Sequence, residues 1–273
     1  MSRGCWAVAA RWLAALAGLC AAGGLSPVWA QAAAGLESDA AARVVERLEA
    51  RDCPGAVRTL NEALPGGDPA VLVLAGAMFE DGICLKAQWD RAVRLYTRAS
   101  EAGSALARWR LAAGYGSALG GPDIGLALWW SHRAETLPAA CRVTGFAETM
   151  DAERFVAAVN AWPSGQAAAC AWVGAVWAGL NADARYDASL QRLKAVGRVR
   201  VTFDPATGRF AAEELEASAD RREWQAGEDD PSRLATLIGA VQAFSARAVR
   251  KAVRPQAVPD GLRHSAEFVF RLR

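Results

Sequence analysis

The chain has only two histidines, His132 and His264, among its 273 residues. No C-x-x-C spacing accompanies them, so the usual pattern of a structural metal site is missing. The motifs G-x-S-x-G and H-E-x-x-H and the phosphate-binding loop are also absent. The carboxylate pair Glu80 and Asp81 is typical of a solvated loop end. The sequence therefore predicts a protein that is not an enzyme and has no metal or cofactor.

Long apolar runs are missing as well. The stretch WLAALAGLCAAGGL, residues 12–25, has fourteen residues, whereas a membrane-spanning helix needs about 20. It follows Arg3 and Arg11 and precedes Val28-Trp29-Ala30, the small-residue pattern at which signal peptides are cleaved. We predict a signal peptide over residues 1–30, cleaved after Ala30. Lipidation at Cys20 is a weaker alternative because bulky Leu19 precedes it.

The chain has no net charge once the predicted signal peptide is left out. Of the 31 Lys and Arg residues, Arg3 and Arg11 lie in the signal, which contains none of the 29 Asp and Glu residues. The mature chain thus has 29 charges of each sign, which gives no electrostatic footprint for nucleic acid.

Four cysteines remain after the signal is removed: Cys53, Cys84, Cys141 and Cys170. An even number in an exported chain indicates disulfides. Four cysteines allow three pairings. We favour Cys53 with Cys84 and Cys141 with Cys170, because each pair would link neighbouring helices, and buried free thiols are the alternative.

The first half of the chain repeats. Ala56, Ala92 and Ala127 are spaced 36 and 35 residues apart, a period typical of stacked two-helix units. Small residues let helices approach at the short end of the usual 8–10 Å range. Gly82 and Gly120-Gly121-Pro122 are predicted helix stops.

These units resemble a known family. LAGAMFEDG, followed by AVRLYTRASEAGSALARWRLAAGY, resembles the Sel-one-like repeat, a relative of the tetratricopeptide repeat, over roughly residues 50–135. The resemblance implies a protein-binding superhelix. Two further helices are predicted at 151–162 and 166–180. We expect Trp172 and Trp177 of the second helix to pack in the core. The alternative is that they line a peptide groove.

In the second half of the chain the hydrophobic pattern changes from a helical period to the alternation of strands. Residues 197–203 alternate as a strand, 204–208 read as a turn, and 209–218 resume an extended but irregular strand. A loop over 220–230 precedes a helix that Asp230 caps and Pro231 begins, and that ends at Arg250-Lys251, whose charges suit a helix C-terminus. We expect one antiparallel sheet with the helix across one face. The residues expected beneath the helix are Val199, Val201, Phe203, Phe268 and Phe270.

This order resembles the C-terminal domain of the TonB family of energy transducers. GRVRVTF with its D-x-x-G turn, AVRKAVRP and above all VPDGLRHSAEFVFRLR carry the resemblance, over residues 184–273. It implies that the last strand lies at a sheet edge and receives an extended peptide by strand addition. Transducers also have an uncleaved anchor with a histidine and a proline-rich linker. Residues 1–30 contain no histidine, and the sequence shows a helical repeat where the linker is expected.

The sequence thus predicts two domains, an all-α helical-repeat solenoid over 36–182 and a small α+β domain over 184–273 with a three-stranded antiparallel sheet and a crossover helix. We expect a periplasmic or secreted interaction protein that binds an envelope protein or peptide through the solenoid groove and the last strand. The alternative is a membrane-anchored TonB-type transducer, and membrane contact is expected only if the N-terminus is uncleaved. The predicted partner strand comprises Ser265, Ala266, Glu267, Phe268, Val269, Phe270 and Arg271.

Overall fold

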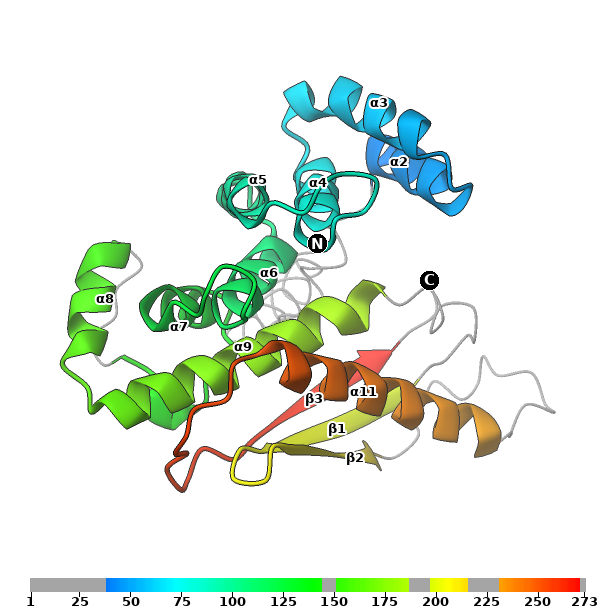
Figure 1. The fold of residues 1–273 in the computed structure, drawn as a ribbon. Helices are drawn as coiled ribbons and strands as arrows, with labels where there is room; N and C mark the ends of the chain where they lie inside the picture. The colour runs from blue at the N-terminus through cyan, green and yellow to red at the C-terminus, as the bar shows by residue number, and fades with distance from the viewer. Residues whose placement is uncertain (1–37, 144–150, 187–196, 216–230, 271–273) are drawn as a thin grey trace, which may run out of the picture.

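A computed structural model of the chain describes residues 38–143, 151–186, 197–215 and 231–270 (Figure 1). These residues form a mostly helical protein with one small three-stranded antiparallel sheet. The α-helices are α2 (Asp39–Glu49), α3 (Cys53–Ala63), α4 (Pro69–Asp81), α5 (Trp89–Glu101), α6 (Ala105–Tyr115), α7 (Ile124–Arg133), α8 (Ala152–Asn160), α9 (Ser164–Tyr186) and α11 (Pro231–Lys251). Short 3₁₀ turns are η2 (Leu64–Gly66) and η3 (Ala139–Cys141), and the strands are β1 (Gly197–Asp204), β2 (Arg209–Leu215) and β3 (His264–Phe270).

The first six α-helices of the described chain form consecutive pairs, α2 with α3, α4 with α5 and α6 with α7 (Figure 1). Side-chain caps start several of them, for example Asp68 on α4 and Ser104 on α6, whose oxygens accept from backbone N–H groups in the first turn. Ala56, Ala92 and Ala127 are all 0% exposed, as expected for the contact positions of a repeat. A Cβ at Gly76 would overlap the Tyr96 ring, so only glycine permits this approach of α4 and α5.

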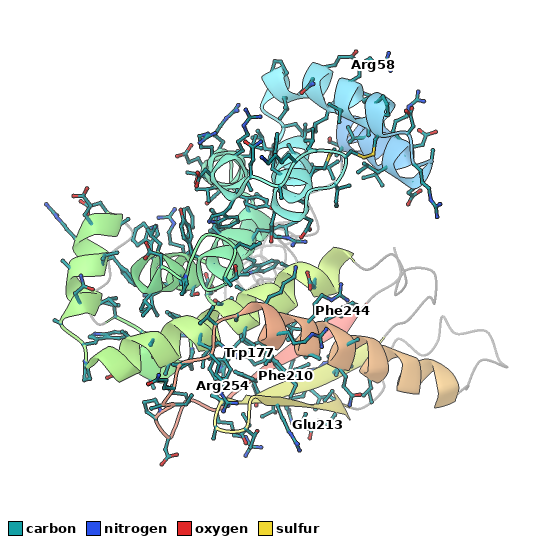
Figure 2. The ribbon with its side chains drawn as sticks, viewed as in Figure 1. Arg58, Trp177, Phe210, Glu213, Phe244 and Arg254 are labelled. Carbon is teal, nitrogen blue, oxygen red and sulfur yellow. A yellow bond between two sulfur atoms is a disulfide. The ribbon has the colours of Figure 1, made fainter. Side chains whose placement is uncertain are left out.

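Helix α9 lies between the helical pairs and the sheet (Figure 1). It contacts α6 and α7 on one side. On the other side Trp172 packs on Phe203 with ring centroids 5.3 Å apart. Trp177 packs on Phe210 at 5.6 Å (Figure 2). Both tryptophans are 1% exposed, which confirms core packing over the groove alternative. One core cluster consequently includes residues of α7, α9, α11 and the sheet.

The predicted domain boundary, between residues 182 and 184, falls inside α9. The division into two domains therefore stays a prediction, and the solenoid with it. The sequence also predicts a short helix over 185–196, with Tyr186, Leu190 and Leu193 on one face, and this segment lies largely outside the described residues.

The sheet has the strand order β2-β1-β3, and both neighbours of β1 are antiparallel to it. The predicted irregularity of the second strand is wrong. Its register runs without a break from Arg198 opposite Leu215 to Asp204 opposite Arg209. The small Ala211 and Ala212 occupy strand positions because cross-strand pairing overrides the weak local alternation, and Ala212 also packs on the core beneath the sheet.

Two disulfides link the helical part of the chain. They join Cys53 to Cys84 and Cys141 to Cys170, the pairs that the sequence favoured. The predicted helix stop at Gly120-Gly121-Pro122 is misplaced, since α6 already ends at Tyr115. At its end, the carbonyl of Gly114 accepts from the Ser117 hydroxyl at 2.7 Å, and the carbonyl of Gly116 accepts from the N–H of Val253, beyond α11, at 2.9 Å.

The described helices include none with the length and apolar character needed to cross a membrane. The predicted signal peptide, with Cys20 and the cleavage after Ala30, lies outside the described residues.

Candidate functional site

Strand β3 lies at an edge of the sheet. Within the described residues it pairs only with β1, Val199 lying opposite Phe268 and Thr202 opposite Ser265. An edge strand presents a row of backbone N–H and C=O groups to a further strand. Within the part of the chain that the structure describes, the prediction that the last strand lies at a sheet edge is confirmed.

The inner face of β3 packs on α9. Trp177 stacks on Phe268 with centroids 6.4 Å apart and contacts the His264 ring at 5.1 Å. Ala266 is half-buried against the same core. The predicted burial of Phe270 concerns a side chain outside the described part of the chain, and Arg271 lies outside it altogether. The core face of β3 is thus occupied by the protein itself.

The outer face of β3 carries matched charges. Glu267 accepts hydrogen bonds from Arg198 at 2.7 Å and from Arg200 at 3.1 Å, and Arg200 also donates to Glu213 of β2 at 2.8 Å. We call Arg198, Arg200, Glu213 and Glu267 the sheet-face ladder; Glu213 lies on the side of the sheet away from the helices (Figure 2). The hydrogen bond from Arg198, then that from Arg200, lowers the pKa of Glu267. Val269 follows on this face and is half-buried.

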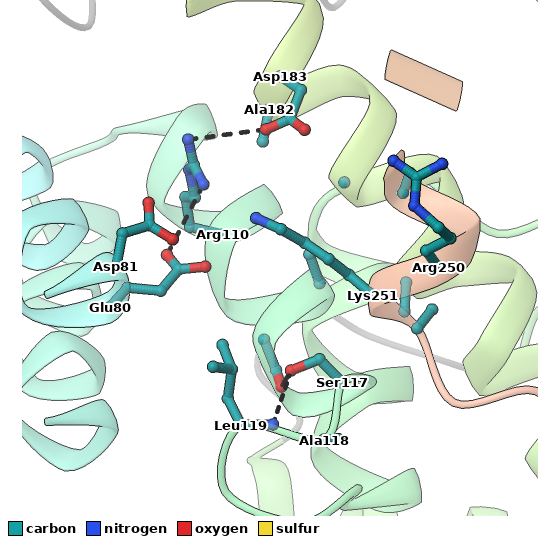
Figure 3. A pocket seen from close by; sticks show the side chains of 16 residues that line it. Glu80, Asp81, Arg110, Ser117, Ala118, Leu119, Ala182, Asp183, Arg250 and Lys251 are labelled. Atoms are coloured by element: carbon teal, nitrogen blue, oxygen red, sulfur yellow. Dashed lines mark hydrogen bonds and ion pairs between the residues drawn. The ribbon is translucent and has the colours of Figure 1, made fainter. Parts of the chain in front are cut away.

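A second candidate site is a pocket of about 530 Å³ between α4, α6, α9 and α11 (Figure 3). Its size is within the range of ligand-binding pockets. Small residues of α6, α9 and α11 and of the segments that follow α6 and α11 form much of its lining, namely Ala113, Gly114, Ala118, Ala175, Gly179, Ala182, Ala248 and Ala252. Charged side chains stand around them, namely Glu80, Asp81, Arg110, Asp183, Arg250 and Lys251.

A buried polar cluster forms one wall of the pocket. The Tyr96 hydroxyl donates to Glu80 Oε2 at 2.6 Å, and the Arg110 guanidinium lies 3.7 Å from Glu80 and 3.8 Å from Asp183. We call Glu80, Tyr96, Arg110 and Asp183 the interior network. Burial, and then the charge of Glu80, raises the pKa of Tyr96, so it stays a neutral donor. Burial alone would lower the pKa of Arg110, but nearby acidic groups, Glu80 first, raise it above its ordinary value.

The expectation for Glu80 is therefore wrong. Its neighbour Asp81 is exposed as expected, but Glu80 is only 7% exposed and belongs to the interior network. A local sequence pattern does not show this, because Tyr96 and Arg110, which satisfy the carboxylate, come from other helices. Sequence reasoning also missed that Arg250 and Lys251 line the pocket.

The two histidines do not come together. His132 packs on Phe155 with centroids 5.6 Å apart, whereas His264 packs on Trp177, and burial lowers the pKa of each. Among the described side chains, no group of three His, Cys, Asp or Glu residues is placed to hold a metal ion.

Comparisons with known proteins find similarity to a solved structure only. No protein-family model matches the chain, and no curated protein matches it. Among solved structures, the chain is similar to a Sel1 repeat protein from Oxalobacter formigenes, with 21% sequence identity and a TM-score of 0.32. The similarity covers 56% of this chain and 61% of that one. A likeness this distant assigns no family, and no comparison matches a TonB domain.

Proposed function

We propose that this chain is an exported interaction protein that receives an extended peptide of an envelope protein as an additional strand beside β3. The observation that carries the proposal is the strand order β2-β1-β3, which leaves one side of β3 without a partner strand among the described residues. Strand addition obtains its affinity from main-chain hydrogen bonds and its specificity from alternate side chains. The TonB-like character of this sheet belongs to the same proposal, as does a role as adaptor or scaffold without catalytic activity.

Export is part of the proposal. Two disulfides support it, since such bonds persist in oxidising compartments and are rare in the cytosol. N-terminal sequencing of the chain from cells tests it. A new N-terminus at Gln31 is expected, whereas an intact N-terminus in the membrane fraction would favour the anchored transducer.

The strand-addition test uses two positions at the same level of the sheet. Ser265 on β3 and Ala211 on β2 both lie opposite Thr202, and both are exposed. A photoreactive residue at Ser265 should crosslink an envelope protein in intact cells, and one at Ala211 should not.

Mass spectrometry then identifies the captured segment, which is synthesised and added to the purified chain. The peptide should slow amide hydrogen exchange in residues 264–270 more than in residues 209–215. Equal capture from both positions, or protection of β2 instead of β3, would contradict strand addition at this edge.

A further inference from the structure

We infer that the pocket between α4, α6, α9 and α11 binds the C-terminal end of a peptide, with the terminal carboxylate on Lys251 and Arg250. The pocket is separate from the β3 edge and draws its lining from positions between 80 and 252. The inference therefore stands independently of strand addition.

The charges around the pocket favour an anionic group. Arg110 is engaged with Glu80 and Asp183, and Asp183 also lies 3.7 Å from Arg247. Arg250 and Lys251 are exposed and make no ion pair with any described residue. The Lys251 side chain extends over the pocket toward Arg110 (Figure 3). Asp81 likewise has no ion pair among the described residues, although its charge acts on Arg110. Two cations without an ion pair therefore face one such anion.

The apolar surface around the pocket favours an occupant with small or apolar side chains. Leu119, which lines the pocket, is 51% exposed, and Val253, next to the lining residue Ala252, is 41% exposed. Both belong to the short group of large apolar residues that remain exposed in the described chain. The contact between Val253 N and Gly116 O brings the segments that carry them together.

The distribution of charge favours a peptide over a fatty acid. An alkyl chain needs an apolar cavity with a single polar end, because any polar group it covers loses its water. Here Glu80 and Asp81 of α4 stand across from the basic side chains of α11, and Asp183 of α9 lies beside Arg110 (Figure 3). A peptide has amide N–H groups along its length that can donate to Asp81, while its carboxylate accepts from Lys251.

The test measures binding of acetyl-Ala-Ala-Leu with a free carboxylate to the purified chain by calorimetry, beside the same peptide as its C-terminal amide and beside octanoate. The free acid should bind at least about tenfold more tightly than the amide, since a hydrogen bond to a charged group contributes about 1.5–3 kcal/mol. Lys251→Gln should weaken binding of the free acid by about tenfold or more. Lys86→Gln, which removes an exposed lysine outside the pocket, should leave it unchanged.

A second variant tests the place of binding without changing charge. Ala118 is exposed and lines the pocket, so Ala118→Trp should obstruct it without disturbing the core. Loss of binding in both Ala118→Trp and Lys251→Gln, with unchanged melting temperatures, supports the inference. Equal binding of acid and amide, tighter binding of octanoate, full binding by either variant, or no binding of the free acid at millimolar concentration overturns it. Hydrogen exchange separates the two proposals, because this peptide should protect residues near 248–253 and not β3.

Discussion

The interior network and the sheet-face ladder use the same chemical groups in opposite surroundings. In the interior network the side chains of Glu80, Arg110 and Asp183 are 5–12% exposed, whereas the ladder side chains are 39–63% exposed. Yet the ladder has the shorter ion-pair distances, from 2.7 to 3.1 Å against 3.7 and 3.8 Å. Distance alone would rank the ladder as the stronger of the two.

Burial reverses this ranking. Exposed ion pairs contribute little to stability, because water solvates the separated partners almost as well and salt screens their attraction. Removing one partner of a buried pair leaves the other desolvated and unmatched, which costs about 3–5 kcal/mol. We therefore expect the interior network to govern the folding of the helical part, and the ladder to govern which surfaces meet the outer face of the sheet.

The largest expected effect comes from breaking the interior network. Glu80→Ala should lower the free energy of unfolding by about 3–5 kcal/mol, since it leaves the buried Arg110 with one carboxylate and the Tyr96 hydroxyl without its acceptor. Urea unfolding monitored by circular dichroism measures the loss. Asp81→Ala, at the exposed neighbouring position, is the control, and its free energy of unfolding should stay near that of the native chain. Similar stability of the two variants would contradict the ranking by burial.

The two disulfides allow the same comparison between a buried and a partly exposed link, here with covalent bonds. They close loops of similar length, with separations of 31 and 29 residues, so loop-closure entropy gives each about 3–4 kcal/mol. Cys141 and Cys170 are both 0% exposed, whereas Cys53 and Cys84 are partly exposed. A mild reductant should therefore open Cys53–Cys84 first. Alkylation and mass spectrometry give the order, and earlier labelling of Cys141 or Cys170 would count against it.

A smaller loss of stability is expected from displacing Tyr96 within the interior network. A Cβ at Gly76 overlaps the Tyr96 ring, so Gly76→Ala should displace the hydroxyl from Glu80 and cost about 1–3 kcal/mol. Gly66→Ala is the matched control, because a Cβ at Gly66 has no heavy atom within 4 Å. The difference between their urea midpoints checks the prediction, and equal midpoints would show that the ring moves without penalty.

Features set by local periodicity could be predicted from the sequence. Ala56, Ala92 and Ala127 mark helix contacts by spacing alone, and alternation from Val199 to Phe203 gives a strand whose three apolar side chains are all 0% exposed. The edge position of β3 was expected only from the resemblance to the TonB C-terminal domain, and the strand order β2-β1-β3 of the described residues agrees with it.

Features that depend on distant partners could not be predicted. Glu80 looked solvated because the hydroxyl and guanidinium that satisfy it lie 16 and 30 positions later in the chain. Helix α9 looked like the end of one domain because its apolar sequence does not say which surface it meets, and it meets both the helical pairs and the sheet. The pocket was missed because no short segment contains it.

The smallest effect on stability is expected from the sheet-face ladder, where a substitution shifts the pKa of Glu267. Hydrogen bonds from Arg198 and then Arg200 favour the ionised form of Glu267, so its pKa in the folded protein lies below the ordinary value. A depressed carboxyl pKa means that the pair stabilises the fold above the ordinary glutamate pKa. This contribution is lost as pH falls through the lower folded value.

Arg198→Gln should therefore raise the Glu267 midpoint in an NMR pH titration, while its urea midpoint at neutral pH should change less than that of Glu80→Ala or Gly76→Ala. Thr202→Val on the same strand removes a hydroxyl and no charge, and should leave the Glu267 midpoint in place. A stability loss in Arg198→Gln as large as that in Glu80→Ala would show that short ion-pair distances outweigh solvent exposure in this protein. The same midpoint in Arg198→Gln and the native chain would show that Arg198 does not hold Glu267 in solution.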